Sequence, residues 1–170
     1  RRQFHIPVIG ITGSNGKTTT KELVSSVLAS HYRTHFTTGN LNNHIGVPLT
    51  LLAMPADTEV AVIEMGANKR GDIAELCTIA EPSHGLITNI GKAHLEGFGG
   101  VEGVKLGKSE LYRFLEQHGG VAFVNRDEPF LAELVRGVKK IIPYGRVEAL
   151  TGVQGLLEIQ LLAEQPFLKV

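Results

Sequence analysis

Short apolar runs alternate along this chain with longer stretches in which apolar residues recur every three or four positions. The short runs predict strands near residues 6–12, 33–38, 59–64, 85–90, 120–125 and 140–144. The longer stretches predict helices near residues 17–31, 46–54, 71–80, 101–116 and 128–137. Alternation of this kind is typical of a doubly wound α/β domain, in which a mostly parallel sheet has helices on both faces.

The C-terminal stretch has a different pattern. Two apolar segments, 155–162 and 167–170, flank a polar turn and predict a small antiparallel β-hairpin. We therefore expect one main domain over residues 1–146 and a hairpin tail of the same domain over residues 147–170. Because the second segment stops early and the first residue is Arg1 rather than methionine, we expect the sequence to be a piece of a longer protein.

The first predicted strand runs directly into a glycine-rich turn that opens the first predicted helix. Glycines let backbone N–H groups approach phosphate oxygens, while the helix N-terminus and Lys17 add positive charge. Thr18 offers a hydroxyl to a magnesium ion bound to the phosphates. We predict an α/β domain of the P-loop type whose nucleoside triphosphate contacts the residues of this turn: Gly13, Ser14, Asn15, Gly16, Lys17, Thr18 and Thr19.

The glycines of this turn are unusually close together. A common phosphate-binding loop has the pattern G-x-x-x-x-G-K-[ST], whereas Gly13 and Gly16 enclose only two residues. The alternative is an ordinary glycine-rich turn between a strand and a helix. The strand, the glycines, the lysine and the hydroxyl groups nevertheless occur in the order that phosphate binding requires. The short spacing therefore indicates a particular subset of phosphate-binding loops.

Two further candidates follow predicted strands, and ligands of open α/β sheets bind beyond the carboxyl ends of the strands. Glu64 ends the apolar run 60–63, where a carboxylate can hold magnesium directly or through water. The alternative for Glu64 is a strand-end carboxylate paired with a surface base. His94 follows the strand predicted at 85–90, and as one of seven histidines it fits a ligand role and a structural role equally.

Lys108 lies on the apolar stripe of the helix predicted at 101–116. An inward lysine either extends to the rim with its ammonium in water, or becomes a neutral nucleophilic amine because burial lowers its pKa. Gly103 and Gly107 lie one turn apart in the same helix and permit close approach of another backbone. The other members of the stripe are Val101, Val104, Leu111 and Leu115.

The segment between the second strand and the second helix is rich in amides. Asn40, Asn42 and Asn43 place three amides within four residues. A turn accounts for part of this composition. A cluster of amides also offers neutral hydrogen-bonding groups to a polar substrate, so we predict that these three residues bind substrate.

Composition restricts the class of function further. The chain has 17 basic and 17 acidic side chains, so bulk charge favours neither nucleic acid nor an anionic membrane as a partner. No apolar run reaches the length of a membrane span. The single cysteine, Cys77, cannot form an internal disulfide and is expected as a small apolar residue in a helix, which fits a reducing cytoplasm.

Taken together, these segments resemble the Mur ligase family of ATP-dependent, amide-forming enzymes of bacterial peptidoglycan synthesis. The resemblance covers about residues 7–145 and is most similar to members that add D-alanyl-D-alanine to UDP-N-acetylmuramoyl-tripeptide. It implies a central ATP-binding domain, with the family's N-terminal UDP-sugar domain and C-terminal domain outside this sequence. The motifs that carry it are TGSNGKT at 12–18, GNLNNHIGVPLTLL at 39–52, EMGAN at 64–68, GDI at 71–73, NIGKAHLEGFG at 89–99 and KSELY at 108–112.

The resemblance also implies roles for the candidate residues. Lys17 would contact the phosphates of ATP, and Thr18 and Glu64 would hold one magnesium ion. His94 and Lys108 would serve a second magnesium ion, with Lys108 carbamylated by carbon dioxide. The amides around Asn40 would face the acceptor substrate. The implied reaction forms a peptide bond through an acyl phosphate, and this domain alone would be inactive.

Other functions also fit parts of this sequence. A ligase of the same superfamily could add a single amino acid or extend folylpolyglutamate. From different classes, a P-loop kinase and a module that only binds nucleotide also fit the loop. A GTPase switch does not fit, because it needs D-x-x-G and no aspartate here has glycine three residues later; the aspartates are Asp57, Asp72 and Asp127.

Overall fold

The structure, a computed structural model, describes residues 1–91, 95–146, 163–164 and 168–169. Within these residues, a parallel sheet of six strands has the order β2-β3-β1-β4-β5-β6. Its strands are β1 (Val8–Thr12), β2 (Thr34–Phe36), β3 (Val60–Glu64), β4 (His84–Ile87), β5 (Val121–Asn125) and β6 (Lys140–Tyr144). The helices are α1 (Lys17–Ala29), α2 (Gly46–Leu52), α3 (Asp72–Ala80), α4 (Leu95–Phe98), α5 (Val101–His118) and α6 (Pro129–Leu134).

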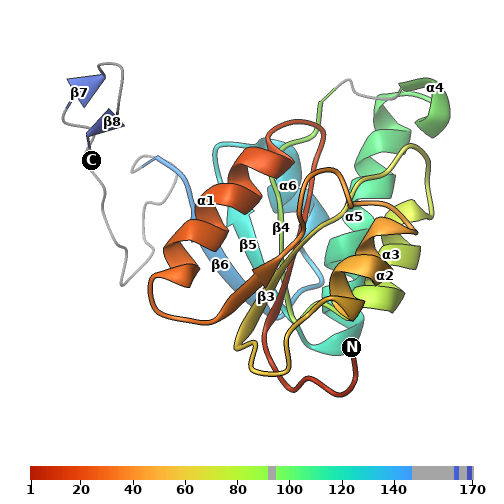
Figure 1. The fold of residues 1–170 in the computed structure, drawn as a ribbon. Helices are drawn as coiled ribbons and strands as arrows, with labels where there is room; N and C mark the ends of the chain where they lie inside the picture. Colours follow the sequence, from red (N-terminus) through yellow and green to blue (C-terminus); the bar gives the residue numbers. More distant parts are fainter. Residues whose placement is uncertain (92–94, 147–162, 165–167, 170) are drawn as a thin grey trace.

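Helices cover both faces of this sheet (Figure 1). Helix α1 packs on one face over a small apolar cluster that includes Ile11 and Val62. Helices α2, α3 and α5 pack on the other face over a larger cluster that includes Val8 and Ile63. Neighbouring residues of one strand thus contribute to opposite clusters, which is why β1 and β3 are apolar at nearly every position. The predicted doubly wound α/β fold is confirmed.

Strand β1 lies at the point where the chain changes direction across the sheet. From β1 the chain passes to β2 at one edge, returns to β3, and then adds β4, β5 and β6 on the other side. Ligands of doubly wound sheets bind at such a switch point. The register pairs Ile11 with Glu64 and Thr12 with Ile87, so the loop after β1 shares one edge with the ends of β3 and β4.

Two features differ from the sequence-based expectations or extend them. Helix α4 was not predicted, because a single turn that contains Gly97 and is followed by Gly99 has little helical periodicity. Near the C-terminus, β7 (Ala163–Glu164) pairs antiparallel with β8 (Leu168–Lys169) in a small hairpin as expected, but β7 lies in the stretch that was predicted as the turn. The predicted first segment of that hairpin, 155–162, lies outside the described residues. In the part of the chain that is described, no helix has the length and apolarity to cross a bilayer.

Candidate nucleotide and metal site

The turn between β1 and α1 has the backbone that an anion-binding loop requires. Gly13 and Gly16 have φ values of 144° and 76°, a region that side chains disfavour. A Cβ on Gly13 would also collide with Oγ1 of Thr88. The first helical hydrogen bond runs from Thr20 N to Gly16 O over 2.9 Å. The N–H groups of residues 17–19 precede that bond and have no helical carbonyl to bind, so they are placed to bind an anion.

Asn89, just after β4, shapes the other half of this loop. Its main-chain oxygen accepts a hydrogen bond from Ser14 N over 3.1 Å, and its Oδ1 accepts one from Asn15 N over 3.0 Å. The carbonyl of Asn15 accepts from Thr88 Oγ1 over 2.7 Å and from Asn89 Nδ2 over 3.0 Å. Asn89 was not among the site residues predicted from the sequence. Its place at the carboxyl end of a strand was the available signal.

Lys17 lies against the loop that it follows. Its Nζ donates hydrogen bonds to Gly13 O over 2.9 Å and to Ser14 O over 3.4 Å. Partial burial lowers the pKa of Lys17, and the negative charge of Glu64 opposes that change. The ammonium is therefore held at the loop, close to where the free N–H groups of α1 begin.

Glu64 is the last residue of β3 and is almost completely buried, with 1% of its surface exposed. Its Oε1 accepts hydrogen bonds from Thr18 Oγ1 over 3.3 Å and from Asn42 Nδ2 over 2.7 Å. Its Oε2 is buried and has no hydrogen-bond partner among the residues that the structure describes. A carboxylate oxygen left in this state is costly unless a cation binds it. The Glu64–Thr18 pair therefore fits a hard divalent cation such as magnesium.

The amide-rich segment holds Glu64 in place. The hydroxyl of Thr37 accepts a hydrogen bond from Glu64 N over 3.0 Å. The carbonyl of Asn42 accepts one from Gly66 N over 2.7 Å, while its amide binds the Glu64 carboxylate. Main chain and side chain of Glu64 are thus both fixed by the segment that follows β2.

The three predicted substrate asparagines have different surroundings. Asn42 binds Glu64, as described above. Oδ1 of Asn43 accepts hydrogen bonds from Ile45 N over 3.1 Å and from Gly46 N over 2.9 Å, and so stabilises the start of α2. Asn40 is exposed. Contact with substrate stays a prediction for all three residues.

A polar pocket of about 520 Å³ opens next to Asn42 and Asn43, between the amide-rich segment and the start of α3. On its other side Oδ2 of Asp72 accepts hydrogen bonds from Asn68 N over 2.9 Å and from Lys69 N over 3.1 Å. Amides, carboxylates and one lysine line this pocket, so it can hydrogen-bond to a polar ligand.

Lys108 is buried in α5 with 2% of its surface exposed, and burial lowers its pKa to about 8, with a further contribution from the positive charge of Lys17. Of the two alternatives for an inward lysine, the structure supports the desolvated amine. Three of the four apolar residues predicted beside it are buried, whereas Val101 is 40% exposed. The prediction for Val101 was wrong because this residue begins the helix and extends past the core.

Phe98 of α4 occupies the space that the glycines of α5 leave open. A Cβ on Gly103 would collide with the Phe98 carbonyl, and one on Gly107 would collide with the Phe98 ring. The Nζ atom of Lys108 lies 5.5 Å from the centre of the same ring. The expected close approach of another backbone is confirmed at Gly103, whereas at Gly107 the neighbour is the Phe98 side chain.

His94 lies outside the described residues. The described ranges contain no group of three or more histidine, cysteine, aspartate or glutamate side chains that could hold a metal ion. A second magnesium site at His94 and Lys108 therefore stays a prediction.

Cys77 is buried in α3, as expected for a small apolar residue, and burial raises the pKa of its thiol to about 12.

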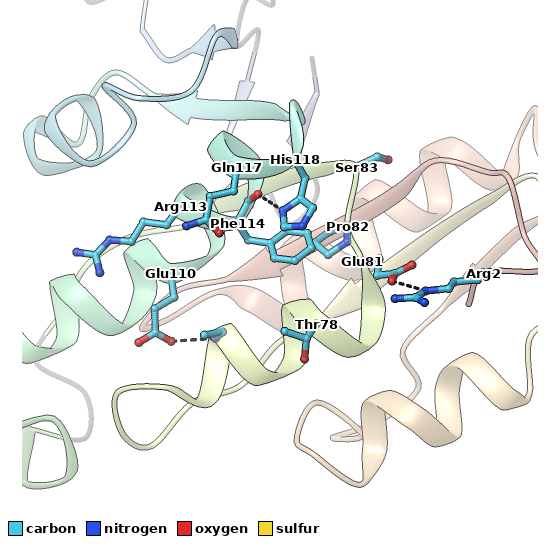
Figure 2. Close-up of a pocket in the computed structure, with 11 residues that line it drawn as sticks. Arg2, Thr78, Glu81, Pro82, Ser83, Glu110, Arg113, Phe114, Gln117 and His118 are labelled. Carbon is cyan, nitrogen blue, oxygen red and sulfur yellow. Dashed lines mark hydrogen bonds and ion pairs between the residues drawn. The ribbon is translucent and has the colours of Figure 1, made fainter.

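A larger hollow of about 850 Å³ lies between α3 and α5 (Figure 2). The ring of His118 stacks on Phe114 with centroids 4.0 Å apart, and Arg2 forms a 2.9 Å ion pair with Glu81. The hollow reaches Ser83, which precedes β4, whereas the glycine-rich loop follows β1 at the opposite edge of the sheet. None of the predicted site residues lines it.

The fold and the site together define a class of protein, an α/β domain with a glycine-rich phosphate-type loop at the switch point of its sheet. Residues 11–156 match the family described as the Mur ligase middle domain. The chain belongs to the Mur ligase family and corresponds to the middle domain of its members.

Several known proteins are similar to this chain. The UDP-N-acetylmuramoyl-tripeptide--D-alanyl-D-alanine ligase of Bacillus subtilis (strain 168) is 50% identical over 124 residues, which are 73% of this chain and 27% of that ligase. The ligase of the same name from Escherichia coli (strain K12) is 43% identical over 127 residues, which are 75% of this chain and 28% of that ligase. The crystal structure of the MurF ligase from Thermotoga maritima in complex with ADP has a TM-score of 0.78 and 37% identity, over 85% of this chain and 34% of that one. This chain thus spans between a quarter and about a third of the length of these relatives.

Proposed function

We propose that this chain is the ATP-binding middle domain of a ligase that joins D-alanyl-D-alanine to UDP-N-acetylmuramoyl-tripeptide in the bacterial cytoplasm, during peptidoglycan synthesis. The observation that carries the proposal is Oε2 of Glu64, which is buried and has no partner within the described part of the chain, while Oε1 of the same carboxylate binds Thr18 at the start of α1. A triphosphate with its magnesium ion would satisfy both the free N–H groups of the loop and this buried oxygen. The substrates are proposed from the names of two relatives, which are 43% and 50% identical to this chain.

Different residues are proposed to bind the phosphates and the magnesium ion of the nucleotide. Residues Gly13 to Thr19 would surround the phosphates. The N–H groups of residues 17–19 would donate to them, because Ser14 N and Asn15 N already bind Asn89. The ammonium of Lys17 would turn from the carbonyls of its own loop to a phosphate oxygen. Thr18 and Glu64 would hold the magnesium ion. When bound, that ion withdraws negative charge from the phosphates and so favours attack on the terminal one.

The proposed reaction has two steps. The terminal carboxylate of the tripeptide attacks the γ-phosphorus of ATP, which forms an acyl phosphate and releases ADP. The amine of D-alanyl-D-alanine then attacks the acyl carbon, loses a proton and displaces inorganic phosphate. Lys17 lowers the electrostatic repulsion between the carboxylate and the triphosphate in the first step. Asn40, Asn42 and Asn43 are proposed to bind the peptide substrate, because Asn42 and Asn43 line the polar pocket and Asn42 also binds Glu64.

Lys108 has a separate proposed role. The low pKa of its amine, about 8, leaves about a tenth of it neutral at pH 7, compared with a far smaller fraction for an ordinary lysine. A neutral amine reacts with carbon dioxide to form a carbamate and releases a proton. With His94, the resulting anion would hold a second magnesium ion. We expect Lys108→Ala to lose activity and to regain part of it when a small carboxylic acid is added. Wild-type activity of this variant without the acid would refute the assignment.

The assay that tests the function uses the whole protein that carries this domain. Phosphate release from ATP is measured with UDP-N-acetylmuramoyl-tripeptide and either D-alanyl-D-alanine or single amino acids as acceptor. The proposal predicts phosphate release and amide formation with the dipeptide only. Equal rates with a single amino acid would point to another ligase of the superfamily, and transfer of phosphate to a stable product without amide formation would point to a kinase.

A further inference from the structure

Lys21 is a completely buried lysine outside the set of residues assigned so far. It lies on α1 one turn after Lys17, and none of its side-chain surface is exposed. Residues four apart share a face of a helix, so Lys21 lies on the same face of α1 as Lys17. Most lysines keep the ammonium group in water. A buried ammonium is costly unless it is paired and hydrogen-bonded, so the burial of Lys21 requires specific partners.

The contacts of the Lys21 ammonium converge on the end of β2. Nζ donates a hydrogen bond to the carbonyl of Thr37 over 2.8 Å and lies 5.5 Å from the centre of the Phe36 ring. It also pairs with the carboxylate of Glu22, whose side chain is 54% exposed. Glu22 is largely exposed to solvent and does not need a buried partner. The hydrogen bond to the Thr37 carbonyl is therefore the contact that holds the ammonium inside the protein.

Thr37 connects the Lys21 contact to Glu64, the proposed metal ligand. Its N–H donates to Val62 O over 3.0 Å, and its hydroxyl accepts from Glu64 N over 3.0 Å. The segment that begins at Thr37 ends at Asn42, whose amide binds Oε1 of Glu64 over 2.7 Å. Lys21 thus fixes the start of a short segment whose two ends both bind Glu64.

We propose that Lys21 is a positioning residue for Glu64: it anchors the Thr37–Asn42 segment so that the carboxylate is oriented for the magnesium ion of the nucleotide. This inference rests on the proposed function, since it assumes that Glu64 binds that ion. Loss of the ammonium frees the Thr37 carbonyl and loosens Asn42, so the carboxylate loses its fixed orientation. The glycine-rich loop is held separately by Asn89 and Thr88, so nucleotide binding without metal is not affected.

The test compares Lys21→Met with the wild-type whole ligase, because methionine is unbranched and fills the same space without an ammonium. The free Mg²⁺ concentration at half-maximal rate is expected to rise about tenfold or more, as for other losses of support around a metal ligand. The affinity for ADP in the presence of EDTA is expected to stay the same. A purely structural role would lower the unfolding midpoint and leave the Mg²⁺ response unchanged, which would overturn the inference.

Ser25→Ala is the matched control. Ser25 is buried on the same helix one turn further along, and its hydroxyl has no hydrogen-bond partner among the described residues. Its Mg²⁺ response is expected to equal that of the wild type; a shift like that of Lys21→Met would overturn the inference. If Lys21→Met does not fold, Lys21→Gln, which keeps a hydrogen-bond donor, should show a smaller shift in the same direction, and no shift would again overturn it.

The outcome for the wild type separates the two proposals. A wild-type protein without ligase activity refutes the proposed function. An active wild type together with an unchanged Mg²⁺ response in the folded Lys21 variant refutes only the role of Lys21.

Discussion

Asn42 donates a hydrogen bond from its amide to Oε1 of Glu64 over 2.7 Å, which connects the amide-rich segment after β2 to the carboxylate at the end of β3. The bond leaves Oε2 of Glu64 as the oxygen without a partner among the described residues. A residue that sequence analysis assigned to substrate therefore also determines how the proposed metal ligand is oriented.

Asn42→Ala should weaken the response of the ligase to magnesium. Without the amide, the carboxylate of Glu64 rotates more freely, and we expect the free Mg²⁺ concentration at half-maximal rate to rise about tenfold. Steady-state rates at varied Mg²⁺ measure this. Asn40→Ala is the control, because Asn40 lies in the same segment but is exposed. Equal Mg²⁺ responses of the two variants would contradict the role of Asn42.

Gly66→Ala should have the same effect by a steric route. A Cβ on Gly66 would lie 2.8 Å from Oδ1 of Asn42, so the alanine pushes that side chain away from Glu64. The Mg²⁺ response of Gly66→Ala should therefore match that of Asn42→Ala. The double variant should be no worse than either single variant, because both act through one contact. Additive losses would show that Gly66 acts by another route.

Lys108→Met should stabilise the chain at pH 7 while it abolishes activity. Burial lowers the pKa of Lys108 from 10.5 to about 8, so the folded state binds the proton of this amine more weakly than the unfolded state does. The cost is about 3 kcal/mol when the pH is below 8. Between pH 8 and 10.5 the unfolded wild type binds more protons than the folded one, so wild-type stability rises with pH. Urea unfolding in buffer free of carbon dioxide should therefore show an advantage of the variant that shrinks over this window, and a constant difference would contradict the burial of a charged amine.

Lys17→Ala should abolish turnover, with a loss of at least about 100-fold in kcat, because a positive charge at the terminal phosphate is removed. The Lys17 ammonium bonds only to carbonyls of its own loop in the described structure, so the unfolding midpoint should change little. Phosphate release and thermal unfolding of the same preparation measure the two quantities. A variant that keeps the wild-type rate would remove Lys17 from the site.

Much of the fold could be predicted from the pattern of apolar residues. The parallel strands are buried on both faces, so they read as continuous apolar runs, and each helix has a stripe. Helix α4 was not predicted, because a single helical turn is too short to show a periodic pattern of apolar residues. Within the site, Gly13, Lys17 and Glu64 were predictable because they follow strands at the switch point.

The contacts between side chains from separate segments were not predictable. Neither the bond between Asn42 and Glu64 nor the contact of Lys21 with Thr37 has a signal in local sequence, because each joins residues that only the folded sheet brings together. Lys21 reads as an ordinary helix lysine until its complete burial is known.

The central claim is that Glu64 binds the magnesium ion of a nucleotide held by the glycine-rich loop. Calorimetric titration of the whole ligase with ATP, in Mg²⁺ and in EDTA, tests this most directly when the wild type is compared with Glu64→Gln, which keeps the shape and removes the charge. We predict that Mg²⁺ strengthens ATP binding to the wild type and no longer does so in the variant, whose affinity in EDTA is preserved. The same Mg²⁺ enhancement in both proteins would contradict the account.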